Sequence, residues 1–320
     1  MATPDPQAWD GTAVAVTGGD GFLGTSLVRL LRELGADVRP VSHREHELRT
    51  ADGARAALTG SEVVFHLAAR VGGIGFNMRN PGVLIHDNLL LAANVFEQSR
   101  LEGVDRLVAV SSVCGYPESP PVPFREDDLW EGRPEPSNAP YGIAKRVLET
   151  FSNAYWQQYG FRSCTPILTN LYGPDDHDDP EDSHVIPALI RKFVEAHEGG
   201  DEPVLVWGTG QATRDFLYVD DAARALVLAA EHADRPFSMN IGTGTERSIA
   251  EIVGLIATLT EFGGDLQWDH TRPDGQSRRL LDVSRARTVL GFEPQISLEE
   301  GLRRTVAAWP HRRGDGTAPG

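Results

Sequence analysis

One stretch decides the fold: Val14-Ala15-Val16-Thr17-Gly18-Gly19-Asp20-Gly21-Phe22-Leu23-Gly24. Its apolar start is typical of a buried strand, and the leucines that follow it recur at helical spacing. Between strand and helix, Gly18, Gly21 and Gly24 stand three residues apart. Glycines at this place let the backbone approach a pyrophosphate, and the first helical turn offers free N–H groups and a positive dipole end. The stretch therefore predicts a dinucleotide-binding unit.

Strands and helices are expected to alternate through the rest of the first half. Apolar runs predict buried strands at 38–41, 63–67 and 107–110, and helices over 82–102 and 139–158. Pro40 fits poorly inside a sheet, so it is expected to end its strand. Alternation of this kind implies a parallel sheet with helices on both faces. The predicted fold class is α/β, a Rossmann-type doubly wound parallel sheet with a smaller C-terminal substrate domain.

The alternation loosens beyond about residue 170, which suggests where the domains divide. We expect residues 10–171 to form the dinucleotide-binding domain, with parts of 211–241 returning to it. Residues 172–310 are expected to form mainly the substrate domain. The two ends, 1–9 and 311–320, are expected to be flexible.

The composition limits the partners of this chain of 320 residues. A net charge of −16 argues against nucleic-acid binding, and no apolar run approaches the ~18 residues of a membrane span. The two cysteines, Cys114 and Cys164, are too few for a disulfide scaffold. His177 lies in an acidic run without ordered ligand spacing, so no metal is expected. These features predict a cytoplasmic protein with a small-molecule ligand.

Tyr141 and Lys145 stand four residues apart, so they share one face of the predicted helix. At roughly 4 Å and a dielectric constant near 20, the ammonium would stabilise a phenolate by about 4 kcal/mol. The pKa of the tyrosine would then fall from about 10 by up to roughly 3 units, into the range of a general acid or base. The alternative is an exposed tyrosine beside a solvated lysine. Arginine would serve such a surface equally well, yet the chain keeps 2 Lys against 28 Arg.

The end of the second strand bears on the cofactor. An acidic residue there would hold the adenosine ribose of NAD. The chain instead has Ser42-His43-Arg44, and Arg44 is a candidate for the extra phosphate of NADP. NADP is therefore favoured, with NAD as the alternative.

Three motifs together resemble the extended short-chain dehydrogenase/reductase family, whose members act on nucleotide sugars. They are the glycine turn, Tyr141 with Lys145, and Ser111-Ser112 at the end of the strand over 107–110. Four segments are most similar to the GDP-L-fucose synthases within that family: Ala68-Ala69-Arg70-Val71-Gly72-Gly73-Ile74, Ser111-Ser112-Val113-Cys114-Gly115-Tyr116-Pro117, Thr169-Asn170-Leu171-Tyr172-Gly173-Pro174 and Ser183-His184-Val185-Ile186-Pro187-Ala188-Leu189. Arg272-Pro273-Asp274-Gly275 adds to the match. Asp20 departs from it, since those synthases often carry a basic residue there.

The resemblance implies a role for each catalytic candidate. Tyr141 would give its proton to the oxygen on sugar carbon 4 while NADPH delivers hydride, with Ser112 bound to the same oxygen. Lys145 would bind the nicotinamide ribose. Cys114 and His184 would be the acid and the base that epimerise carbons 3 and 5, and which of them is the base stays open. The implied reaction converts GDP-4-keto-6-deoxy-D-mannose to GDP-L-fucose.

The resemblance also implies the ligand contacts. Contacts to the cofactor are expected from Gly18, Gly21, Phe22, Leu23, Gly24, Arg44, Leu67, Ala68, Ala69, Asn88, Tyr141, Lys145 and Leu168. Contacts to the substrate are expected from Asn170, His184, Lys192, Trp207, Arg214 and Arg279.

Two other functions remain open at this stage. Gly72-Gly73-Ile74-Gly75-Phe76 is also similar to the GDP-mannose 3,5-epimerases, which are redox-neutral and hold NAD tightly, although those enzymes have a lysine where this chain has His184. The second is a non-catalytic dinucleotide-binding regulator. The two long helices, 82–102 and 139–158, predict a homodimer by analogy with the family.

Overall fold

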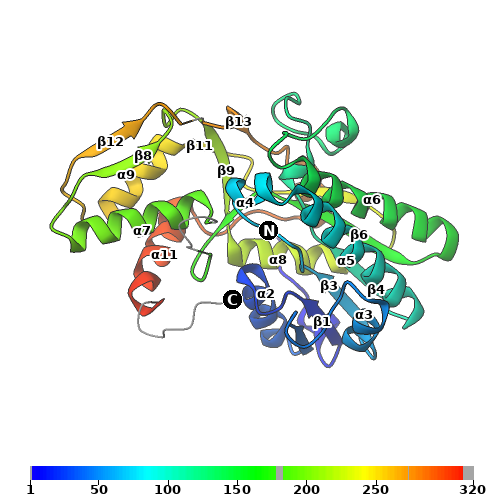
Figure 1. Ribbon diagram of the computed structural model, residues 1–320. Helices are drawn as coiled ribbons and strands as arrows, with labels where there is room; N and C mark the ends of the chain where they lie inside the picture. Colours follow the sequence, from blue (N-terminus) through cyan, green and yellow to red (C-terminus); the bar gives the residue numbers. More distant parts are fainter. Residues whose placement is uncertain (1, 178–182, 273, 313–320) are drawn as a thin grey trace.

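The computed structural model describes residues 2–177, 183–272 and 274–312 (Figure 1). Seven strands form one parallel sheet in the order β10-β6-β4-β3-β1-β2, with β5 beside β6. Their bounds are β1 Ala13–Thr17, β2 Asp37–Val41, β3 Val63–His66, β4 Arg106–Ala109, β5 Ser111–Ser112, β6 Arg162–Leu168 and β10 Ser238–Ile241. The predicted doubly wound parallel sheet is confirmed.

Helices cover both faces of this sheet because its strands are apolar on both sides. Val14 and Val16 pack into one core with α2 (Phe22–Glu33) and α8 (Val219–Glu231). Ala15 points to the other face and packs into a second core. That face is covered by α3 Ala51–Leu58, α5 Pro81–Leu101 and α6 Ala139–Tyr159. Successive side chains of a strand alternate between faces, so one short run of apolar residues supplies both cores.

A second, smaller group of elements lies beside the parallel sheet (Figure 1). Its strands are β7 Asn170–Tyr172, β8 Val204–Trp207, β9 Thr213–Tyr218, β11 Glu246–Ser248, β12 Leu266–Asp269 and β13 Arg278–Arg279. Its helices are α7 Val185–Glu198, α9 Ile249–Leu259 and α11 Leu298–Arg312. The chain returns from this second group to the parallel sheet after β9. The strand β9 belongs to the small sheet, whereas the next helix, α8, packs on β4 and β6, and the next strand, β10, pairs with β6.

The remaining elements are short and connect these layers. They are α1 Pro6–Trp9, α4 Ile74–Arg79, α10 Ser284–Leu290 and the 3-10 turns η1 Val113–Gly115 and η2 Glu126–Trp130. No helix in the described residues is both long and apolar enough to span a bilayer.

Pro40 differs from its prediction because it lies inside β2 rather than ending it. The strand continues to Val41, whose carbonyl oxygen accepts a hydrogen bond from the Gly18 N–H. β2 is the last strand in the order, so one side of it has no strand to pair with. An edge position tolerates a residue without an N–H, which explains why the proline stays within the strand.

The N-terminal end was predicted to be flexible, and the structure differs there too. Residues from Ala2 onward lie against the molecule: the Ala2 N–H donates to the Gly291 carbonyl, and Arg224 donates to the Ala2 carbonyl. Trp9 is buried, and its indole N–H donates to Glu231. One buried tryptophan is enough to hold a short terminal segment against the core. Residues 313–320 of the other end lie outside the described residues, as do Pro273 and residues 178–182 of the acidic run.

Candidate active site

The glycine turn after β1 is shaped for a phosphate group. Gly18 has a φ of +69°, and a Cβ on Gly24 would lie 2.0 Å from the Gly18 carbonyl oxygen. Gly21 precedes α2 and supplies no side-chain cap, which leaves the N–H groups of the first turn to an outside acceptor. A pyrophosphate is such an acceptor, so the residues present fit a dinucleotide.

Gly24→Ala is expected to weaken dinucleotide binding by about tenfold or more and to cost about 1–3 kcal/mol of folding free energy, because the turn must move away from the new methyl group. Equilibrium binding of NADPH and thermal unfolding measure the two effects. Gly254→Ala is the matched control, since a Cβ on this glycine of α9 meets nothing within 4 Å. Equal NADPH affinity in the two variants would contradict the assignment of the turn.

The loop after β3 packs directly on the glycine turn. The Leu67 N–H donates to the Thr17 carbonyl at 3.1 Å, and the Ala68 N–H donates to the Thr17 hydroxyl at 3.3 Å. The Asn88 amide accepts from the Arg70 N–H and donates to the Arg70 and Leu84 carbonyls. Asn88 therefore fixes the loop that holds Ala69, and its contact to the cofactor stays a prediction.

Tyr141 and Lys145 lie on the first turns of α6, beside the segment that carries Ser112. The Tyr141 phenol faces the Ser112 side chain, which acts to lower the pKa of the phenol. The Lys145 ammonium donates to the Val110 carbonyl at 2.8 Å and lies 5.8 Å from the centre of the Tyr141 ring. Leu168 at the end of β6 is the register partner of Ser112. The spacing of the two residues on the helix thus places them as predicted, although the ammonium lies over the ring.

The pKa shifts differ from the prediction. Burial, with a smaller effect of the Cys114 charge, raises the pKa of Tyr141, and the Ser112 side chain opposes this rise. Burial lowers the pKa of Lys145 to about 8. Burial followed by the charge of Lys145 also lowers the pKa of His66 to about 3, so this histidine stays neutral. A charged form is disfavoured in each case by loss of water, which outweighs the predicted attraction. Tyr141 is therefore protonated at neutral pH, as a proton donor must be.

The segment that carries Cys114 is fixed by contacts from both ends. The Ser112 hydroxyl accepts from the Cys114 N–H at 3.2 Å. Arg146 donates to the carbonyls of Gly115 and Gly132. Arg146 follows Lys145 directly in sequence, and its contribution was missed because a buried arginine on a helix has no motif.

His184 precedes α7, in the second group of elements. Its Nδ1 lies 3.1 Å from Asp176 Oδ1 and 3.4 Å from Oδ2, and the Asp176 carboxylate is 2% exposed. The bond to Asp176 raises the pKa of the imidazole. No hydrogen bond or ion pair of the described residues joins His184 to Cys114. Asp176 was missed because it resembled one member of a solvated acidic run.

Asp176→Asn is expected to lower the pKa of His184, because the anion that stabilises the imidazolium is removed. A raised pKa means that His184 stays protonated to a higher pH, so the titration midpoint should move toward lower pH in the variant. NMR titration of the ring proton, assigned with His184→Asn, measures it. Asp175 is an exposed aspartate next to Asp176, so Asp175→Asn is the matched control. An unchanged midpoint in Asp176→Asn would show that the pair does not form in solution.

Two arginines predicted to bind the substrate lie side by side. Arg214 on β9 and Arg279 on β13 are register partners on parallel strands. Burial, and then the charge of Arg279, lowers the pKa of Arg214 to about 10, while the charges of Asp274 and, more weakly, Cys114 act in the opposite direction. Paired guanidinium groups in partial burial suit a pyrophosphate, which presents several anionic oxygens to such forks.

Of the other substrate candidates, Lys192 lies beside Trp207, which is 60% exposed. Arg272 lies 4.9 Å and Lys192 5.4 Å from its ring centre. The Lys192 ammonium donates to the Leu205 carbonyl at 2.8 Å. Asn170 donates to the Asp215 carbonyl, which ties β7 to β9. An exposed indole between cations offers a flat face to a planar group such as a base.

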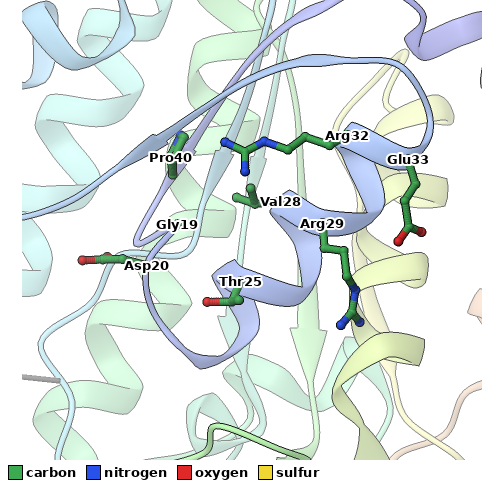
Figure 2. A pocket seen from close by; sticks show the side chains of 8 residues that line it. All are labelled: Gly19, Asp20, Thr25, Val28, Arg29, Arg32, Glu33 and Pro40. Carbon is green, nitrogen blue, oxygen red and sulfur yellow. The ribbon is translucent and has the colours of Figure 1, made fainter. Parts of the chain in front are cut away.

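A surface hollow of about 570 Å³ lies on the outer side of the glycine turn (Figure 2). It is lined by Gly19, Asp20, Thr25, Val28, Arg29, Arg32, Glu33 and Pro40. None of the candidate catalytic side chains lines it. The predicted catalytic residues Ser112 and Tyr141 lie elsewhere, beyond the strand β4 and at the start of α6.

Comparisons with known proteins agree with this geometry. The NAD dependent epimerase/dehydratase family matches residues 14–242. The chain is 38% identical over 295 residues to GDP-L-fucose synthase 1 of Arabidopsis thaliana, which covers 91% of both chains. It is 37% identical over 307 residues to GDP-L-fucose synthase of Escherichia coli (strain K12), covering 91% of this chain and 94% of that protein.

Solved structures give the same result. A GDP-L-fucose synthetase from Naegleria fowleri bound to NADP superposes with a TM-score of 0.88 at 26% identity, covering 98% of this chain and 97% of that one. A GDP-6-OMe-4-keto-L-xylo-heptose reductase from C. jejuni gives a TM-score of 0.86 at 26% identity, covering 97% and 100%. The chain belongs to the NAD dependent epimerase/dehydratase family, within the extended short-chain dehydrogenases/reductases.

Proposed function

We propose that this chain is an NADPH-dependent epimerase and reductase that converts GDP-4-keto-6-deoxy-D-mannose to GDP-L-fucose. The observation that carries the proposal is the grouping of Ser112, Cys114 and Tyr141 at one strand end, with Arg214 near the thiol. The GDP-L-fucose synthases of a plant and a bacterium, similar over nine-tenths of the chain, support it. The NADP-bound neighbour supports the cofactor.

The reduction step uses the protonated phenol. NADPH, when bound, supplies the hydride that reduces carbon 4. Tyr141 gives its proton to the carbon-4 oxygen, and Ser112 donates a hydrogen bond to that oxygen. The Lys145 ammonium, already held by the Val110 carbonyl, would bind the ribose of the cofactor. The raised pKa of Tyr141 keeps the proton on the phenol until the oxygen becomes a strong base.

The epimerisation steps use the other two candidates. A 4-keto group acidifies the protons on carbons 3 and 5, so one group removes a proton and another returns it on the opposite ring face. A thiol and an imidazole both exchange protons readily near neutral pH, which suits Cys114 and His184 to these two roles. Asp176 holds Nδ1 of the His184 imidazole, which leaves Nε2 to exchange a proton with the substrate. The raised pKa of His184 favours the proton-donor role for this residue.

NADPH oxidation on addition of GDP-4-keto-6-deoxy-D-mannose tests the proposal. Stoichiometric oxidation with GDP-L-fucose formed, identified by mass and NMR, is the expected result. Substrate conversion without NADPH oxidation would instead identify the redox-neutral epimerase. Tight cofactor binding without any turnover of 4-keto nucleotide sugars would identify the non-catalytic regulator.

We also propose a cytoplasmic homodimer formed through α5 and α6. Leu101, Trp156 and Tyr159 near the ends of these helices are exposed apolar side chains, which supports a covered face. Sedimentation velocity measures the mass in solution, and a monomer at micromolar concentration would contradict the dimer.

A further inference from the structure

An acidic side chain stands where the adenosine ribose of a dinucleotide is expected. Asp20 is exposed in the glycine turn, and its Oδ2 accepts a hydrogen bond from the Ser42 hydroxyl at 2.8 Å. Ser42 lies just past β2, and its oxygen accepts from the Arg44 N–H at 3.3 Å. The end of the second strand is the place at which Rossmann folds put an acid for the ribose hydroxyls. Here the strand end lacks an acid, and the carboxylate reaches it from the turn.

The Asp20 carboxylate is not neutralised by the arginines of α2. Figure 2 shows its side chain pointing away from Arg29 and Arg32. Arg29 is paired with Asp220, and Arg32 donates to the Val38 carbonyl. The carboxylate is therefore free to act on a ligand at the strand end, with the Ser42 hydroxyl as its one described partner.

NAD and NADP differ in the group that their adenosine ribose would present to Asp20. An unphosphorylated ribose presents two hydroxyl donors, and an ionised carboxylate accepts both. A ribose 2′-phosphate presents only anionic oxygens, which Asp20 repels and the neighbouring Arg44 attracts. The site therefore carries one group for each form of the cofactor.

We propose that Asp20, held by Ser42, binds the adenosine ribose diol, so that this chain binds and uses NADH as well as NADPH. The inference rests on the proposed dinucleotide site and adds the determinant of its cofactor choice. Asp20 is then a specificity-determining residue and Arg44 its counterpart for the phosphate.

Binding of NADH and NADPH to the full chain, measured by calorimetry without substrate, tests this proposal. The dissociation constants of the wild type are expected to agree within about tenfold. Asp20→Arg should weaken NADH and strengthen NADPH, moving their ratio by about 100-fold, because charge-assisted hydrogen bonds are lost on one side and gained on the other. Arg44→Gln should move the ratio in the opposite direction.

Asp37→Asn is the matched control, since this exposed aspartate begins the same strand at its far end. Its ratio should equal that of the wild type. A wild-type NADH affinity more than about 100-fold below that of NADPH, or an unchanged ratio in Asp20→Arg, would overturn the inference while leaving the proposed function intact. Failure of both cofactors to bind would overturn the proposed function itself.

Discussion

Tyr141→Phe is expected to lower kcat for keto reduction by about 10²–10⁴-fold, the contribution of a positioned general acid. Phenylalanine fills the same space but lacks the hydroxyl that faces Ser112, so it supplies no proton to the carbon-4 oxygen. The Lys145 contact to Val110 does not involve the phenol and should survive. Stopped-flow oxidation of NADPH gives kcat, and equilibrium binding of NADPH should stay within about threefold of the wild type.

Tyr159→Phe provides the control on the same helix. This tyrosine ends α6, is about half exposed, and packs under Arg100. Its loss should leave kcat unchanged. Reduction by Tyr141→Phe at more than about a tenth of the wild-type rate would show that another group supplies the proton.

Cys114→Ser is expected to abolish epimerisation while slow reduction of the unepimerised keto sugar continues. A serine hydroxyl is a far weaker acid than a thiol, so it does not exchange a carbon-bound proton at neutral pH. The Ser112 bond to the backbone of residue 114 is independent of the side chain and should hold the segment in place. Exchange at carbons 3 and 5 in deuterated water, followed by NMR, should fall by about 10²–10⁴-fold.

Cys164→Ala tests whether any cysteine change has this effect. Cys164 is buried in β6, where burial raises the pKa of its thiol far above neutrality. This variant should lose stability but keep epimerisation. If GDP-L-fucose remained the only product of Cys114→Ser, the role assigned to Cys114 would be wrong.

The sequence predicted the parallel sheet because the relevant information is local. Continuous apolar runs, as in Val14 to Val16, and helical leucine spacing each depend on near neighbours. Pro40 was misplaced because its tolerance depends on the strand being an edge, which is a property of the whole sheet. The burial of Trp9 was missed because it depends on residues far along the chain, such as Glu231, which accepts a hydrogen bond from its indole.

The candidate site was predictable only where spacing sets geometry. Tyr141 and Lys145 share a helix face, so their proximity followed from a difference of four residues. The direction of the Tyr141 pKa shift was wrong because burial, which depends on tertiary packing, exceeds the pair attraction. Asp176 binds His184, and Arg146 binds the carbonyl of Gly115. Neither contact belongs to a sequence motif, so no pattern pointed to these two residues.

The path of the chain between the two groups of elements has a consequence during synthesis. β10, at residues 238–241, is the last strand to join the parallel sheet, and it pairs with β6. At about 5–20 residues per second, a ribosome needs roughly 4–14 s to go from the end of β6 at Leu168 to the start of β10 at Ser238, and during this time the edge of β6 is unpaired. An unpaired strand edge is a template for aggregation. A fragment that stops at residue 171 lacks β10 and should therefore aggregate rather than fold as an autonomous nucleotide-binding unit.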